Sequence, residues 1–141
     1  MPINQIVISH TEARVMMDAA LRAASDHGVP GAIAVVDAAG HLILAERRDG
    51  TMHAAINIAI GKAATAVAFQ RPTAAIEDVV LAGRSPMLTL DSVTPQPYVP
   101  LKGGHPITQG DKIIGGLAVA GTMDADMDEV IAIAALQSSP R

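Results

Sequence analysis

The stretch LKGGHPITQGDKIIGGLAVAG, residues 101–121, contains the pattern that decides the fold. A polar Gln-Gly-Asp turn separates the short segment Pro106–Thr108 from a mostly apolar run, Lys112–Ala120. Two such segments on either side of a turn are typical of a β-hairpin. Gly115 and Gly116 interrupt the second arm, and glycine inside a strand indicates that backbone or a ligand approaches closely there.

An earlier stretch has the same character. Residues 32–36 are rich in β-forming residues, residues 37–40 read Asp-Ala-Ala-Gly, and residues 41–47 return as a second apolar run. This order predicts another β-hairpin.

Helices are expected around the two hairpins. Ser9 and Glu12 have the spacing of a capping box, which favours a helix start at this point. The predicted helices cover residues 10–27, 52–70, 73–81 and 124–137. Between them, residues 83–104 read as a proline-rich loop, with a possible extra strand near residues 97–101.

The predicted order is α-β-β-α-α-β-β-α. Paired hairpins between helices indicate an α+β fold, in which helices pack on an antiparallel sheet. A Rossmann unit would need parallel crossovers, which this order lacks. Gly61-Lys62 is not a P-loop, because position 56 is isoleucine where that motif needs its first glycine.

Composition limits the partners. The chain has 141 residues, of which 50% are hydrophobic, so we expect one domain over residues 1–141. One Phe, one Tyr and no Trp leave short side chains to fill the interior, which favours additional burial in a homo-oligomer. A formal charge of −4 without a basic run argues against nucleic acid. Because no leader pattern and no apolar run of membrane-spanning length is present, we expect a cytoplasmic protein without a membrane partner.

Four blocks in order carry a resemblance to a known family. They read AVVDAAGHLILAERRDG, IAIGKAATAVAF, GGHPITQGDKIIGGLAVAG and DADMDEVIAIAA. With them the chain resembles the GlcG/HbpS family, which includes haem-binding and proposed haem-degrading proteins and the C-terminal domain of PduO-type proteins. The resemblance implies a profilin-like fold of α/β/α layers, with a central antiparallel sheet of about five strands flanked by helices. It also implies a homo-oligomer built from dimers, such as an octamer.

Two departures from the family pattern add ionisable groups. Arg48 stands where the family commonly has Met, in Arg-Met-Asp-Gly, and His105 replaces a small residue in the motif GG-x-P-I. If these loops face one cavity, Arg48, His53 and His105 can converge on an anion such as a carboxylate or a haem propionate.

The candidate residues follow from these loops. Candidates for catalysis are Arg48, His53, Lys62 and His105, and candidates for holding a cofactor are His53, His105, Gly103, Gly104 and Pro106. We expect all of them to border one pocket, completed across a subunit interface. Each has an ordinary alternative: a histidine making loop hydrogen bonds, an arginine turned to solvent, or a lysine that snorkels or pairs with an acid.

The three aspartates at 124, 126 and 128 imitate the start of a calcium loop. Position 6 of that loop is Glu129 rather than glycine and position 12 is Ala135 rather than glutamate, so we expect helix capping and no metal site.

Three functions remain open. The first is a small-ligand-binding protein that binds or sequesters haem or another tetrapyrrole. The second is a cofactor-independent catabolic enzyme, of lyase, hydratase, isomerase or hydrolase type, in which Arg48 anchors a small carboxylate-bearing metabolite. The third is a ligand-free assembly subunit. The neighbouring genes discriminate the first two, because a haem-uptake operon and a catabolic operon point in opposite directions.

Overall fold

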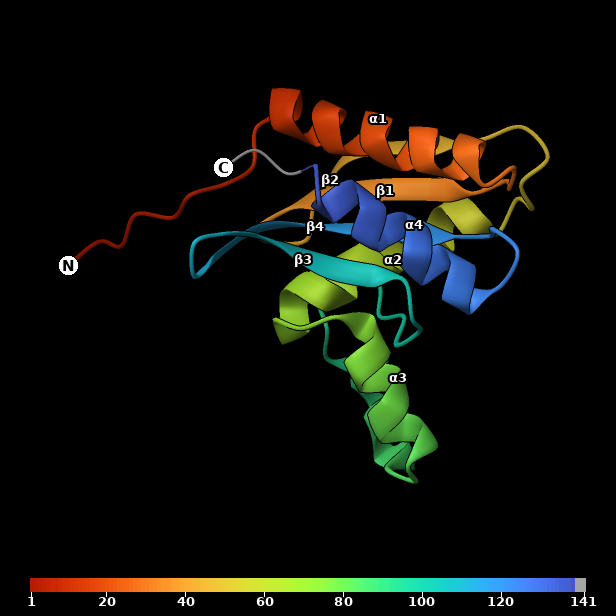
Figure 1. Ribbon diagram of the computed structural model, residues 1–141. Coiled ribbons are helices and arrows are strands. Elements are labelled where there is room, and N and C mark those ends of the chain that lie inside the picture. Colours follow the sequence, from red (N-terminus) through yellow and green to blue (C-terminus); the bar gives the residue numbers. More distant parts are fainter. Residues whose placement is uncertain (139–141) are drawn as a thin grey trace.

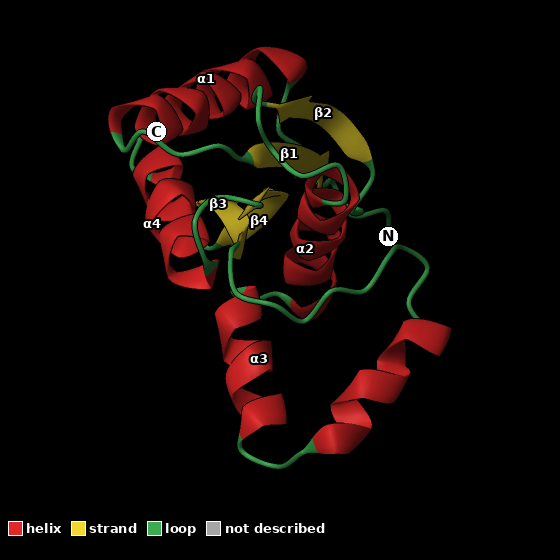
Figure 2. Cartoon of the chain, turned by 90° about the vertical axis from the view of Figure 1, so that its right-hand side faces the viewer, coloured by secondary structure: helices red, strands yellow, loops and turns green. Residues whose placement is uncertain are grey.

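Three layers build the molecule in the computed structural model, which describes residues 1–138. Helices α1 (His10–Asp26) and α4 (Ala125–Leu136) cover one face of a central sheet, and α2 (Ala55–Phe69) covers the other (Figures 1 and 2). The expected α+β fold is confirmed.

The sheet contains both predicted hairpins. Strands β1 (Ala32–Asp37) and β2 (Leu42–Arg47) form the first, and β3 (Gly104–Gln109) and β4 (Lys112–Ala120) form the second. Within residues 1–138 the strand order is β2-β1-β4-β3, and all neighbouring strands are antiparallel. The hairpins therefore meet at the centre of the sheet, along β1 and β4.

The expectation of about five strands was wrong, since the described residues form a four-stranded sheet. The segment proposed as an extra strand, residues 97–101, packs on α2 instead. There the Val99 N–H donates to the Thr65 hydroxyl at 2.8 Å, and Val99 fills the space where Gly61 would carry a Cβ. Pro97 and Pro100 have no N–H to offer a sheet ladder.

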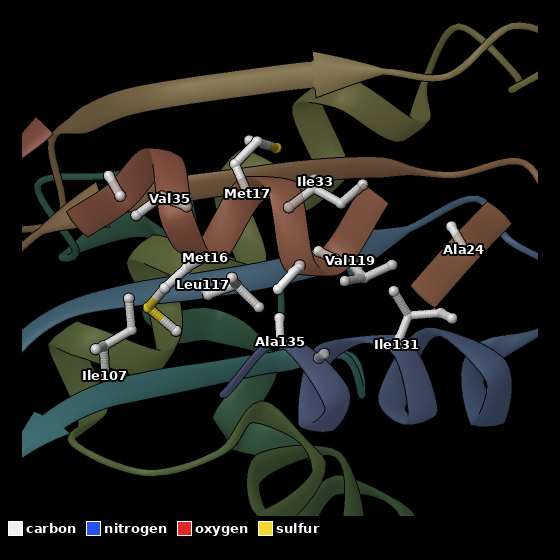
Figure 3. Close-up of a cluster of buried hydrophobic side chains, with 14 of the residues drawn as sticks. Met16, Met17, Ala24, Ile33, Val35, Ile107, Leu117, Val119, Ile131 and Ala135 are labelled. Atoms are coloured by element: carbon white, nitrogen blue, oxygen red, sulfur yellow. The ribbon is translucent and has the colours of Figure 1, made fainter. Parts of the chain in front are cut away.

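The two faces of the sheet carry side chains of different size. Toward α1 and α4 it presents larger residues, which pack against Met16, Met17 and Ile131 (Figure 3). Toward α2 it presents mainly alanine, and α2 meets it with further alanines. Small side chains on both surfaces allow α2 to approach the sheet closely.

The helix boundaries have local causes. Ser9 caps α1 by accepting a hydrogen bond from the Glu12 N–H at 3.1 Å, as predicted. Helix α2 begins at Ala55, later than expected, because the Thr51 side chain accepts from the Gly31 N–H at 2.8 Å and holds this loop against β1. Among the described residues, no helix combines the length and the apolar character needed to cross a bilayer.

A helical arm leaves the three layers at Thr73. It consists of α3 (Thr73–Leu81) and a 3-10 helix, η1 (Ser85–Ser92), inside the region expected to be a loop (Figure 2). No residue of η1 is buried, and the arm exposes the large apolar side chains of Val79, Leu81 and Leu88. Val93, directly after η1, is exposed as well.

Candidate functional site

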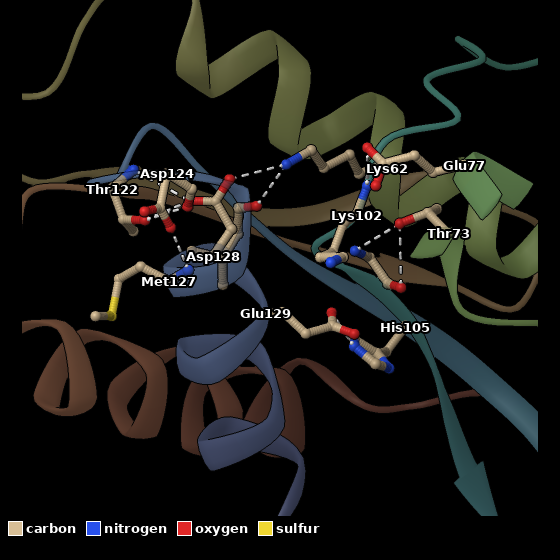
Figure 4. A network of polar contacts seen from close by, with 12 residues as sticks. Lys62, Thr73, Glu77, Lys102, His105, Thr122, Asp124, Met127, Asp128 and Glu129 are labelled. Carbon is tan, nitrogen blue, oxygen red and sulfur yellow. Dashed lines mark hydrogen bonds and ion pairs between the residues drawn. The ribbon is translucent and has the colours of Figure 1, made fainter. Parts of the chain in front are cut away.

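A buried ion pair joins α2 to α4 (Figure 4). The Lys62 ammonium lies 3.1 Å from Asp128 Oδ2 and donates to the Val119 carbonyl at 3.0 Å. Their side chains are 3% and 8% exposed. Charges this deeply buried need a partner and hydrogen bonds to offset the loss of water. Of the alternatives left open for Lys62, pairing with an acid is the one that the structure shows.

Asp128 is held at its second oxygen as well. Oδ1 accepts from the backbone N–H of Thr122 at 3.1 Å and from the Thr122 hydroxyl. Beside it, Asp124 caps α4 by accepting from the Met127 N–H at 2.8 Å, so the helix-capping interpretation is confirmed. Both members of the ion pair thus sit in a fixed network.

Gly103 and Gly104 leave space for Lys62. Gly103 has φ +122°, and a Cβ there would stand 2.9 Å from Lys62 Nζ and 2.6 Å from the Val119 oxygen. A Cβ on Gly104 would stand 2.6 Å from the Lys62 carbonyl oxygen. The double glycine therefore lets the lysine reach across the start of β3 to α4.

The second double glycine has a related cause. A Cβ on Gly115 would stand 2.6 Å from the Val36 carbonyl oxygen, and one on Gly116 would stand 2.7 Å from that of Ala63. The close approach predicted for these two positions is thus made by backbone, together with the side chains of Ile8 and Val67.

Thr73 fixes the start of β3 from the side of α3. Its side chain is fully buried, and its hydroxyl accepts from the Gly104 N–H at 2.8 Å. The double glycine is therefore hydrogen-bonded to the first residue of α3 on one side and packed against the buried Lys62 on the other.

A cavity of about 220 Å³ opens beside the ion pair. Lys62, Asp128 and Glu77 line it, and the remaining lining residues are mostly apolar: Met52, Ile58, Leu101, Ala120 and Ala125. A wider depression of about 420 Å³ adjoins it and shares Met52, Ala125 and Asp128.

Carboxylates outnumber cations around this cavity. Glu77 and Asp124 stand near the Lys62–Asp128 pair. Lys102 forms an ion pair of 2.9 Å with Asp126. That carboxylate, with smaller contributions from Glu77 and Asp78, raises the pKa of Lys102. Arg48, His53 and His105, the residues expected to converge on an anion, are not among the residues that line this cavity.

His105 lies on the face of the sheet that α4 covers. Its Nε2 is 2.7 Å from Glu129 Oε1, and the residue is 9% exposed. Pro106, next along β3, pairs with Gly116 of β4. Figure 4 shows His105 and Glu129 turned toward one another.

Arg48 and His53 share the loop between β2 and α2. Arg48 Nε donates to the Val29 carbonyl at 3.1 Å, and the residue lines a depression of about 390 Å³ together with Glu46, Arg47 and Asp49. His53 is exposed, next to Met52 of the cavity described above.

The predicted residues thus fall into separate groups within one chain. Lys62 lies with Gly103 and Gly104, while Arg48 follows β2, the sheet edge opposite to the β3 edge that carries His105. One chain does not bring Arg48 and His105 into one pocket. Completion of a shared pocket by a second subunit stays a prediction.

Asp128 was missed as a partner of Lys62, although the sequence contains a signal for it. Ile131, Ala132 and Ala135 follow at the three-, four- and seven-residue spacings of one helix face, and all are buried. A carboxylate on that face needs a cation. Thr73 and Glu129 carry no comparable signal, because their partners lie on β3, 31 and 24 positions away.

Known sequences match most of the chain. The family model for the haem degrading protein HbpS-like group matches residues 8–137. A 15.0 kDa protein from the dhaT-dhaS intergenic region of Citrobacter freundii is 31% identical over 129 residues, covering 92% of this chain and 89% of that protein. Protein GlcG of Escherichia coli K12 is 30% identical over 117 residues, covering 83% of this chain and 84% of GlcG.

Solved structures share the fold. HbpS of Streptomyces reticuli, crystallised as a double mutant, superposes with a TM-score of 0.85 at 28% identity, covering 99% of this chain and 92% of that one. The PduOC:haem complex gives a TM-score of 0.84 at 28% identity, covering 94% of this chain and 95% of that one.

Proposed function

The chain belongs to the HbpS-like family of haem degrading proteins, and on this basis we propose that it is a small-ligand-binding protein whose ligand is haem. The observation that carries the proposal is its likeness to PduOC in complex with haem, which extends over 94% of the chain.

The loop from Arg47 to His53 suits haem better than the cavity beside Lys62 does. It offers two arginines for the propionates, and it exposes His53 and 56% of Met52 to the solvent. Imidazole and thioether are both known axial ligands of haem iron. Bound there, haem would supply an iron centre, while the chain's own residues would hold the propionates and one axial position.

His105 is the second candidate for the iron. Its Nε2 is engaged by Glu129 at 2.7 Å, so it would have to bind through Nδ1 or give up that contact. We therefore place His53 ahead of His105.

The cofactor-independent enzyme draws less support from the structure. Lys62 and His105, two of the three groups expected to transfer protons, are held by carboxylates of α4, while the third, His53, is exposed. Lys62 would have to leave its carboxylate to serve as a base, and His105 would have to use Nδ1.

Hemin titration of the purified protein tests the haem proposal. We expect a saturable Soret shift, strongly weakened by His53→Ala and little changed by His41→Ala, a control for exposed histidine. A shift that never saturates, or one that His53→Ala and His105→Ala both leave unchanged, would show adsorption and contradict the proposal.

We also propose a homo-oligomer built from dimers, in the cytoplasm. The support for the oligomer is the apolar surface of the α3–η1 arm, which the other residues of the described range 1–138 leave exposed. Light scattering coupled to size-exclusion chromatography should give a multiple of 14.5 kDa, and a monomer mass at micromolar concentration would contradict it.

A further inference from the structure

The cavity beside Lys62 and Asp128 has the size of a small-molecule site. Its volume of about 220 Å³ corresponds to roughly seven waters at about 30 Å³ each. A ligand of a few non-hydrogen atoms fits that space.

The ion pair on its wall has little capacity left for a ligand. Asp128 accepts from Lys62 at Oδ2 and from both Thr122 donors at Oδ1. Lys62 donates to Asp128 and to the Val119 carbonyl. A ligand head group that required either residue would have to break bonds that stabilise a buried charge.

Glu77 is the lining residue with acceptor capacity to spare. It is half-buried on α3, and its recorded hydrogen bond is a long one, 3.4 Å from the Lys102 N–H to Oε1. An ionised carboxylate can accept at about four positions. Figure 4 shows Glu77 beside Lys102, at the α3 side of the network.

The charges near the cavity favour a cation. The cavity lining carries one ammonium group, Lys62, and two carboxylates, Glu77 and Asp128, and Asp124 lines the adjoining depression. An anionic head group would add to this negative excess, whereas an ammonium head group would reduce it.

We propose that this cavity binds a small aliphatic ammonium ion. The ammonium group donates to Glu77, and the alkyl body contacts the apolar walls formed by Ile58, Leu101 and Ala120. The cavity shares Met52 with the loop proposed for haem, but its ammonium contact, Glu77, lies on α3 outside that loop. The Glu77 variant described below therefore lets either proposal fail without the other.

Three probes of equal length test the choice of head group: butylammonium, butanol and butyrate. We titrate each into the uniformly ¹⁵N-labelled protein at neutral pH and follow the backbone amide signals of Gly121 and Ala125. Butylammonium should change the chemical shifts of these two amides saturably and at the lowest concentration. Butanol should need a higher concentration, and butyrate should leave both signals unchanged. Equal or tighter binding of butyrate overturns the proposal, as does the absence of saturable shifts with butylammonium.

Two variants test the position of the site. Glu77→Gln should weaken the binding of butylammonium by about tenfold to hundredfold, because one charge-assisted hydrogen bond is lost. The affinity for butanol should stay unchanged. Asp78→Asn removes a neighbouring charge of α3 that does not line the cavity, and should have a much smaller effect. Equal effects of the two variants would overturn the proposal, because they would show general charge attraction.

Ala125→Leu adds volume at the cavity wall. Ala125 is exposed at the first turn of α4, so the variant should keep the amide spectrum of the folded protein. It should abolish saturable shifts with both butylammonium and butanol. Unchanged binding of butylammonium in this folded variant would overturn the placement of the ligand.

Discussion

Lys62 and Asp128 lie 66 positions apart in the chain, yet their charged groups meet at 3.1 Å in the interior. Lys62 belongs to the helix on one face of the sheet and Asp128 to a helix on the other, so the pair connects the two helical layers. Removing one partner leaves an uncompensated buried charge.

We expect Lys62→Met to lower the free energy of unfolding by about 3–5 kcal/mol, the usual cost of breaking a buried pair. Combining it with Asp128→Leu should cost less than the sum of the two single changes, because no unpaired charge remains. Urea denaturation measures all three variants. The control is Lys102→Met, whose partner Asp126 has a side chain 85% exposed and which should change stability by less than about 1 kcal/mol. Strict additivity at Lys62 and Asp128 would contradict the coupling.

Gly103→Ala should destabilise the protein by about 2–4 kcal/mol, because φ +122° and contacts of 2.6 Å and 2.9 Å leave no room for a Cβ. The matched control is Gly110→Ala, where φ is +62° and a Cβ would meet nothing within 4 Å. Denaturation curves that place both variants at equal stability would show that the space beside Lys62 is not needed.

Thr73→Val should lower the free energy of unfolding by about 1–3 kcal/mol, since it leaves the buried Gly104 N–H without its acceptor. Thr73→Ser keeps the hydroxyl and should cost less. Calorimetric unfolding compares the two, and an equal loss would assign the role of Thr73 to its methyl group.

The only tyrosine of the chain gives a direct pH measurement. Burial, with a smaller contribution from Asp91, raises the pKa of Tyr98 above its usual value, and its hydroxyl donates to the Met87 carbonyl at 2.8 Å. Folding therefore favours the protonated phenol, so this stabilisation is complete below the unfolded pKa of about 10 and is lost as pH rises through the higher folded pKa. Absorbance at 295 nm should give a later midpoint for the folded protein than for the protein in urea. Coincident midpoints would contradict the burial of Tyr98 by η1.

If the loop after β2 holds haem propionates, Arg48→Leu should weaken hemin binding by about 1.5–3 kcal/mol through the loss of a charge-assisted bond. Arg22→Leu, at an exposed position of α1, is the control for net charge. Equal affinities of the two variants in a hemin titration would remove Arg48 from the proposed site.

The two hairpins were predictable because their signals are local. The Gln-Gly-Asp turn and the Asp-Ala-Ala-Gly turn each separate β-rich runs, and the structure pairs these runs as expected. The pairing of β1 with β4 has no local signal, because it joins residues such as Ala34 and Ala118. The supposed strand at 97–101 has strand-like residues, but its hydrogen bonding is taken by Thr65 of α2.

The site was predicted less well than the fold, for a physical reason. Lys62 was recognised as a charge in an apolar helix, but its partner depends on how two helical layers are placed around the sheet. The double glycine at 103 and 104 was predicted to help hold a cofactor, and the group that approaches it within the chain is that same lysine. A sequence shows that a buried charge needs a partner, whereas the identity of the partner depends on the tertiary arrangement.

The strand order has a kinetic consequence. Each hairpin closes over a short stretch of chain, but the sheet forms only when β1 meets β4 across the whole intervening segment that contains α2, α3 and η1. Closing such a long loop costs entropy before any contact compensates for it, so docking of the two hairpins is the step that should limit the folding rate. Substitutions along the β1–β4 seam should then slow refolding, while changes in the α3–η1 arm should mainly speed unfolding.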